Sequence, residues 1–348
     1  MMEIIYNEAV DFAFSLYRLA NRQQFRIRCS EMELKGLSEI ERWVLKIEKE
    51  LSPFLLSDID LIIKQLPVTL WNLLYISQRP EPCSRAEELI DRLEQLTVDE
   101  YLKHVHRLTE LPEGTKLTKE MIVLKRTETT SDSFANHDTE ADMLLALFNN
   151  PESFLSRIKK TIHEYYDTVY VKTADDFKEI LESKLKWHRA ELKKGEKKYL
   201  EAITHQSISS IFNTDKDPDI FFSLFLDIDV TISISSLTMF IGAGTDAIIK
   251  SRTNRDTADI LFNTLGDPKR LELLRLISHR RWYSSELAEH FGLTPATMSY
   301  HLGKLAAVGF AQLEKGDQKR FYYSLNKDIV RSYLNAAAAD LLGEETDY

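Results

Sequence analysis

Cysteine, glycine and proline are scarce in this sequence, which has 2, 11 and 9 of them among 348 residues. The two cysteines, Cys29 and Cys83, are far apart and form no CxxC pair, so a disulfide-stapled fold is excluded and a reducing compartment is favoured. Low glycine and proline contents exclude collagen-like and low-complexity chains. With 43% hydrophobic residues the chain can build a buried core, which excludes disorder over its whole length.

Long apolar runs are also lacking. The longest stretch without a charged residue, Val230–Thr245, contains several Ser and Thr. It is shorter than the roughly 18 apolar residues that a membrane-spanning helix needs. The amino terminus lacks the basic and then apolar segments of a secretory signal. We therefore expect a soluble, cytoplasmic protein without a membrane partner.

Charge is distributed unevenly along the chain. The formal net charge is −10, and residues 1–250 hold 32 Lys and Arg against 42 Asp and Glu. Residues 251–331 reverse this balance, with 13 basic against 9 acidic residues. The pattern predicts an acidic sensor or dimerisation domain over 1–250 and a modestly basic module over 256–342, a layout typical of a regulator with one DNA-reading end.

Helical periodicity dominates the first domain, and the predicted fold is mainly α (α+β) with a small β element. Two capping boxes are expected, Ser84 with Glu87 and Thr97 with Glu100, and Gly195 is expected to break a long helix. The expected helices are Asn7–Ala20, Leu37–Leu51, Pro53–Gln65, Pro67–Ser77, Ser84–Leu96, Val98–Thr109, Asp138–Phe148, Pro151–Tyr170 and Thr173–His205.

Strand signals are few in the same domain. Met121–Lys125 predicts a short strand, and the Phe, Ile, Val and Thr content of Ile220–Ile234 predicts one or two more. Gly242–Ala247 formally matches the GxGxxA fingerprint of dinucleotide-binding proteins. That fingerprint needs a following parallel strand with an acidic residue, which the sequence lacks. We interpret the segment as a turn into a connecting helix and expect no cofactor.

Helix start signals are dense after residue 256. Asp267 with Pro268 and Thr294 with Pro295 each pair an N-cap residue with a first-turn proline, and Ser284 is expected to cap a short helix between them. The short helix ends at Gly292, so it forms a helix-turn-helix with the helix at 295–308. Two strand-like runs joined by a polar tip then make a wing at 310–325, and a final helix over 326–342 is expected to pair with its twin or with the first domain.

The outer face of the 295–308 helix carries short or hydrogen-bonding side chains and one lysine, as a helix in the DNA major groove requires. His301 lies beside its core positions and is expected to be interior. The wing adds cations suited to phosphate contact. The candidate DNA-binding residues are Thr294, Pro295, Ala296, Thr297, Ser299, Tyr300, Lys304, Lys315, Gln318, Lys319 and Arg320.

Four segments of this module together resemble the arsenic-resistance-regulator (ArsR) winged-helix repressors: Leu261–Leu274, Ser285–Leu293, Thr297–Leu302 and Phe321–Leu325. The resemblance covers about residues 257–334. It implies a dimeric, cytoplasmic, DNA-binding transcriptional regulator, usually a repressor that an effector releases. A homodimer would present its two recognition helices to a near-palindromic operator of double-stranded DNA.

The module departs from the metal sensors of that family. They carry a cysteine cluster where this chain has Tyr283–Glu286, or His and Asp in the last helix, where Asp328–Leu342 contains no His. Zinc-like and arsenical ions need thiolate or imidazole ligands, so we expect no metal site here. Sensing is expected in residues 1–250, through a non-metal small molecule or a protein partner whose identity the sequence does not give.

Enzymatic motifs are absent from the sequence, and we expect no enzyme. His104 and His106 are two residues apart, so on a helix they cannot chelate one ion. Phe221, Phe222 and Phe225 suit core packing better than an effector pocket. The alternative, an amino-terminal enzyme or protein-docking domain with an accessory winged helix, stays open at this point.

Overall fold

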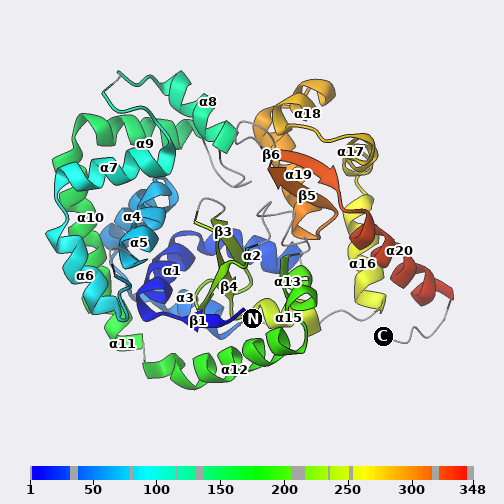
Figure 1. The fold of residues 1–348 in the computed structure, drawn as a ribbon, viewed down its shortest axis with the longest axis horizontal. Coiled ribbons are helices and arrows are strands. Elements are labelled where there is room, and N and C mark those ends of the chain that lie inside the picture. Colours follow the sequence, from blue (N-terminus) through cyan, green and yellow to red (C-terminus); the bar gives the residue numbers. More distant parts are fainter. Residues whose placement is uncertain are drawn as a thin grey trace. The chain divides into compact units, whose positions relative to one another are not determined.

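The protein forms two compact units in the computed structural model, whose elements are labelled in Figure 1. The first unit is built from residues 1–127, 136–190 and 218–245, and the second from 128–135, 191–217 and 246–348. The residues that the structure describes are 2–31, 38–78, 81–114, 116–129, 137–173, 175–204, 216–233, 236–250, 254–315 and 321–342.

Helix α1 (Glu8–Ala20) lies at the core of the first unit. Asn7 begins it, since its side-chain oxygen accepts a hydrogen bond from the Val10 amide at 3.0 Å. Most residues of this helix are buried, including the charged Asp11 and Arg18, as expected of a helix in the interior of a protein. The fully buried side chains of α1 include Val10, Phe12, Phe14, Leu16 and Leu19.

Further helices surround α1. Each helix expected in this part of the sequence has a counterpart, although π-helical turns (η1, η2) and a 3-10 turn (η3) interrupt the longer ones. The elements are α2 (Arg22–Glu31), α3 (Glu39–Glu50), α4 (Pro53–Ile59), η1 (Asp60–Lys64), α5 (Val68–Gln78), α6 (Ala86–Gln95), α7 (Val98–Thr109), α8 (Lys119–Thr129), α9 (His137–Asn149), α10 (Pro151–Tyr165), η2 (Tyr166–Tyr170), α11 (Val171–Thr173), η3 (Asp175–Phe177) and α12 (Lys178–Lys194).

Two local expectations are wrong. Met121–Lys125 is not a strand but part of α8, in which Ile122 and Arg126, four residues apart, are both buried. Ser84 and Glu87 form no capping box. Helix α6 begins after Arg85, and the Ser84 amide donates to the Glu88 carboxylate at 2.7 Å. The capping box of Thr97 with Glu100 is confirmed.

The sheet of the first unit has four strands in the order β1 (Ile4–Tyr6), β2 (Asp219–Ser223), β4 (Thr238–Gly242) and β3 (Val230–Ser233). β1, β2 and β4 are parallel, and β3 is antiparallel to β4. The sequence predicts β2 and β3 but neither β1 nor β4. All five residues of β4 are buried, as is usual for strands of a parallel sheet.

Gly242 closes this sheet against the turn at Asp227. A Cβ on Gly242 would lie 2.0 Å from the carbonyl oxygen of Asp227, and Asp227 itself has a φ of 54°. Gly242, the last residue of β4, therefore allows two backbone segments to approach closely. In the described residues after β4, the chain continues into α15 (Thr245–Lys250) and not into another strand of this sheet.

Gly195 separates α12 from α13 (Glu196–Thr204), which confirms the predicted break.

The second unit contains a winged helix. The core of the winged helix includes Leu273, Leu287, Met298, Leu302, Leu305 and Phe310. Its elements are α16 (Asn254–Leu265), α17 (Pro268–His279), α18 (Ser284–Phe291), α19 (Pro295–Ala307), β5 (Ala311–Lys315), β6 (Phe321–Leu325) and α20 (Lys327–Leu342).

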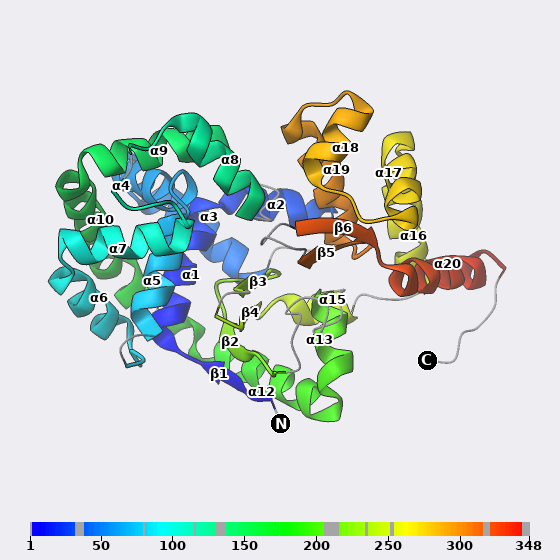
Figure 2. The ribbon, with the colours of Figure 1, turned by 45° about the horizontal axis from the view of Figure 1, so that its top comes forward.

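Helices α16 and α20 pack side by side in this unit, as both ribbon views show (Figures 1 and 2). Strands β5 and β6 form an antiparallel hairpin, and Trp282 adds an isolated bridge to Tyr323. Among the described residues no helix is by itself long and apolar enough to cross a membrane. The segments Pro53–Lys64 and Val68–Gln78 reach that length only together, across a 79° bend.

Candidate nucleic-acid interface

The helix-turn-helix is formed by α18 and α19. Tyr283, not Ser284 as expected, is the N-cap of α18, and its amide donates to the Glu286 carboxylate at 2.9 Å. Gly292 ends α18 with a φ of 60°, a left-handed conformation that glycine adopts without strain. This glycine allows the tight turn that joins α18 to α19.

Helix α19 is the second helix of this motif. The Thr294 hydroxyl accepts a hydrogen bond from the Thr297 amide at 3.2 Å, and Pro295 occupies the first turn. Three of its apolar side chains are fully buried against the other helices of the unit, as predicted: Met298, Leu302 and Leu305. The helix is therefore anchored along one face.

The opposite face of α19 holds the predicted contact residues. Tyr300 is 57% exposed. The Lys304 ammonium lies 5.5 Å from the centre of the Tyr300 ring, within cation–π distance. Thr294, Pro295, Ala296 and Thr297 are exposed, whereas Ser299 and Lys304 are half-buried. The structure thus brings seven of the predicted residues together on one surface.

His301 is buried on the inner side of the same helix, as predicted. Its Nδ1 lies 3.7 Å from the carboxylate of Asp267, the N-cap of α17. Burial lowers the pKa of His301 and outweighs the opposing effect of Asp267. The neutral ring therefore packs as an interior side chain next to the exposed Tyr300.

The wing is described only in its strands. Tyr323 is buried beneath the hairpin, and Lys315 is the last residue of β5. The predicted phosphate contacts Gln318, Lys319 and Arg320 lie outside the described residues, as does the side chain of Lys315. Two neighbouring arginines, Arg280 and Arg281, lie just before α18 and are exposed. They are not among the candidate DNA-binding residues predicted from the sequence. An Arg-Arg pair followed by an aromatic residue is the sequence signal that could have indicated them.

The three phenylalanines of the first unit that the sequence assigns to core packing are buried: Phe221, Phe222 and Phe225. Phe225 packs against Trp43 with ring centres 4.9 Å apart. His104 and His106 contact different partners, the Asn72 side chain and the Leu111 carbonyl. Among the described residues no group of three or more His, Cys, Asp or Glu side chains could hold a metal ion.

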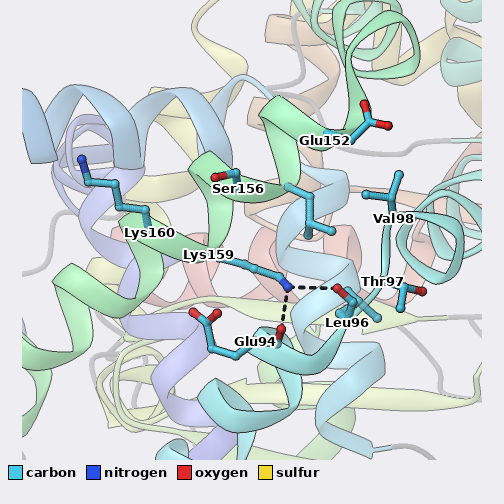
Figure 3. A pocket seen from close by; sticks show the side chains of 9 residues that line it. Glu94, Leu96, Thr97, Val98, Glu152, Ser156, Lys159 and Lys160 are labelled. Carbon is cyan, nitrogen blue, oxygen red and sulfur yellow. Dashed lines mark hydrogen bonds between the residues drawn. The ribbon is translucent and has the colours of Figure 1, made fainter.

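An open depression of about 540 Å³ lies between α10 and the α6–α7 turn. Figure 3 shows Lys159 pointing across it at two backbone carbonyl oxygens, those of Glu94 at 2.6 Å and Leu96 at 2.9 Å. The ammonium thereby completes the carboxyl end of α6. The Lys159 ammonium in this depression is thus already held by backbone carbonyl groups of the protein.

Buried polar groups surround α1 at the carboxyl edge of the sheet. Asp11 accepts hydrogen bonds from the Ser223 hydroxyl at 2.6 Å and from the Phe225 amide at 3.3 Å, and burial raises its pKa to about 6. Arg18, which is fully buried, donates to Glu41 at 2.5 Å and to Asp227 at 3.4 Å. These contacts join α1 to α3 and to the turn after β2.

Comparison with known proteins finds relatives of the second unit. A helix-turn-helix domain family matches residues 265–314. The arsenical resistance operon repressor of Staphylococcus xylosus is 32% identical over 75 residues, which are 22% of this chain and 70% of that protein. The transcriptional repressor SdpR of Bacillus subtilis (strain 168) is 30% identical over 76 residues, 22% of this chain and 82% of that protein. No solved structure matches the chain.

Proposed function

Because the chain belongs, through its C-terminal module, to the helix-turn-helix repressor family of the arsenical resistance operon repressor and SdpR, we propose that it is a sequence-specific, DNA-binding transcriptional repressor. One observation carries the proposal. Helix α19 buries its apolar face and turns short polar side chains and Tyr300 outward. This is the arrangement that a helix needs to enter the major groove.

In this proposal the amino-terminal half of α19 reads the DNA. Thr297, Ser299 and Tyr300 reach base edges or phosphates, and Lys304 contributes charge to the backbone. Thr294, Pro295 and Ala296 form the leading end of the helix. Proline has no N–H and the Thr297 amide is used by the cap, so the Ala296 amide is the group that suits a phosphate oxygen. The wing residues Lys315, Gln318, Lys319 and Arg320 contact the backbone, which adds affinity without sequence preference.

A homodimer is part of the proposal. Four large apolar side chains of the winged helix are exposed on two adjoining helices, Phe262 (51%) on α16 and Leu334 (51%), Leu341 (70%) and Leu342 (70%) on α20. Such apolar side chains mark an association surface. A two-fold dimer presents two α19 helices to half-sites about one helical turn apart, and the operator would then be near-palindromic.

We also propose that the first unit controls the repressor by binding a non-metal small molecule or a protein partner. An effector that binds one arrangement of the dimer more tightly shifts the population towards it and so changes the affinity for DNA. The proposal includes a cytoplasmic location, since a repressor must reach chromosomal DNA.

The experiment is selection of bound duplexes from a random-sequence pool with the full chain, followed by binding measurements on the enriched sequence. We expect an enriched near-palindromic motif, and Tyr300→Ala should weaken binding to it by about 1–3 kcal/mol while changing binding to unrelated duplex little. Chelator should not change the complex. Failure to enrich any sequence, with a folded chain, would refute the proposal.

The dimer has its own test. Leu334→Glu with Leu341→Glu puts two charges on the exposed face of α20, and we expect sedimentation to show a monomer whose affinity for the enriched duplex is at least tenfold lower. Arg331→Glu with Asp340→Lys, which changes exposed charged residues of the same helix, is the control. An unaltered dimer in the first variant would show that the subunits associate elsewhere.

A further inference from the structure

Arg280 and Arg281 lie in the short segment between α17 and α18. The next residue, Trp282, is fixed to the wing by two backbone hydrogen bonds with Tyr323, at 3.0 and 2.8 Å. The segment is therefore an added edge of the wing sheet and not a loose connection. Its backbone holds both arginines at fixed positions beside the amino terminus of α18.

Both guanidinium groups lie on aromatic rings. The Cζ of Arg280 is 3.4 Å from the centre of the Trp282 ring, and the Cζ of Arg281 is 5.6 Å from that of Tyr322. The Tyr322 ring is itself stacked on Tyr283, with ring centres 4.0 Å apart. The Arg280 Nη1 also donates to the Arg281 carbonyl oxygen at 3.0 Å. Stacking itself uses none of the N–H donors and restricts the side chains, so less freedom is lost when they bind a partner.

The ion pairs of these arginines are long and exposed. Arg280 lies 3.5 Å from the Glu286 carboxylate, which also caps α18, and Arg281 lies 3.4 Å from Glu314. The two arginine side chains are 54% and 58% exposed. Surface pairs of this kind contribute about 0–1 kcal/mol and are screened by salt. Both cations can therefore bind a stronger anionic partner.

We propose that Arg280 and Arg281 form a second backbone clamp on the DNA, gripping phosphates beside the wing. The inference rests on the proposed function. In a helix-turn-helix complex the first helix lies across the sugar–phosphate backbone, and α18 is that helix. Two fixed guanidinium forks at its amino end suit phosphate oxygens, which arginine binds in a bidentate manner. The clamp adds affinity and orientation but no sequence preference.

The test compares salt dependence on two duplexes, the one enriched by selection and an unrelated one of equal length, between about 50 and 200 mM NaCl. We expect Arg280→Ala with Arg281→Ala to weaken binding to both duplexes by the same factor. The slope of log affinity against log salt should flatten by about 0.9 per lost contact, or about 1.8 for both. Arg280→Lys with Arg281→Lys keeps the charges and should keep most of the slope.

The matched control is Arg42→Ala with Arg85→Ala, which removes the same charge from exposed positions of the first unit and should leave the slope unchanged. An unchanged slope in the Arg280 and Arg281 alanine variant overturns the clamp. The clamp is also overturned if the lysine variant or the control flattens the salt slope as much as the alanine variant does. If the unaltered chain binds neither duplex, the proposed function itself is refuted. If the unaltered chain binds DNA but the alanine variant keeps the same salt slope, only the clamp is refuted.

Discussion

Three arginines of the first unit and two of the second differ in how they are paired with carboxylates. In the first unit Arg18, Arg22 and Arg26 each pair with two carboxylates, and these pairs join α1 and α2 to neighbouring elements. In the second unit Arg280 and Arg281 point outward with one long contact each to a carboxylate. Internal pairing leaves a cation little affinity for a partner, whereas an exposed, stacked guanidinium keeps its affinity. The difference separates the charges that stabilise the fold from those available for binding.

The sheets of the two units show the same contrast. β2 and β4 of the first unit are parallel and almost wholly buried, so their residues can only pack. β5 and β6 of the second unit are antiparallel, and such a sheet can leave one face to solvent. Tyr323 faces the core while Tyr322 is partly exposed and stacks on Tyr283. The second sheet thus has one face towards the core and another that is partly exposed.

The largest expected effect tests whether the buried charges of the first unit are structural. Arg18→Met removes the cation between Glu41 and Asp227 and leaves two buried carboxylates without it. We expect a loss of about 3–5 kcal/mol in the free energy of unfolding, measured by urea denaturation of the full chain. Arg85→Met, at an exposed position, should change it by less than about 0.5 kcal/mol. Equal losses in the two variants would show that the buried pairs of Arg18 stabilise the fold no more than an exposed arginine does.

Gly242→Ala tests the close packing of the same unit. The new Cβ would lie 2.0 Å from the Asp227 carbonyl oxygen, so one backbone segment must move. We expect a loss of about 3 kcal/mol, at the upper end of overpacking effects. Gly195→Ala is the control, because its Cβ would make only an ordinary contact at 3.8 Å, and it should cost less than about 1 kcal/mol. A tolerated Gly242→Ala would mean that the turn at Asp227 can adjust.

How much the sequence predicts depends on whether the signal is local. Asp267 with Pro268, Thr294 with Pro295 and Gly292 are local signals, and they predict the ends of the winged-helix elements well. β1 is a three-residue strand that pairs with β2, more than 200 residues away, and no local pattern encodes such a pairing. Helix α2 is likewise unpredicted, because its residues are mostly polar and its arginines are held by carboxylates of other elements.

The candidate site follows the same rule. The face of α19 is predicted because helical spacing alone divides Met298, Leu302 and Leu305 from Tyr300. Arg280 and Arg281 are not predicted, since their exposed, stacked positions depend on two rings, Trp282 and Tyr322. Tyr322 belongs to strand β6, which lies far from the arginines in the sequence. Tertiary stacking of this kind leaves no periodic trace in the sequence.

Asp11→Asn tests the buried carboxyl group of α1 through the pH dependence of stability. Burial raises the pKa of Asp11 to about 6 in the folded chain from an ordinary 3.8, so the folded state holds the proton more tightly than the unfolded state. The stability from this group is full below pH 3.8 and is lost as pH rises to about 6. Between pH 4.5 and 7 the unaltered chain should lose about 2 kcal/mol more than the variant in urea denaturation. Parallel curves would show that Asp11 stays ionised throughout.

The smallest expected effect on stability concerns Thr294, a polar side chain of the second unit that is engaged within the fold. Its hydroxyl caps α19, and the proposed DNA contact places phosphate near the same helix end. Thr294→Asn and Thr294→Asp both preserve a capping oxygen, so each should stay within about 0.5 kcal/mol of the unaltered chain in unfolding free energy. They differ in charge, and only the carboxylate would repel a nearby phosphate.

Binding to the enriched duplex should therefore separate the two variants. Thr294→Asn should bind within a few-fold of the unaltered chain, while Thr294→Asp should bind at least tenfold more weakly and recover part of that loss as salt is raised, since salt screens the repulsion. Equal binding by the two variants would mean that the amino end of α19 does not approach phosphate. Thr294 would then act only as a cap, like the internally paired side chains of the first unit, and the DNA-contacting surface would begin further along the helix, at Tyr300.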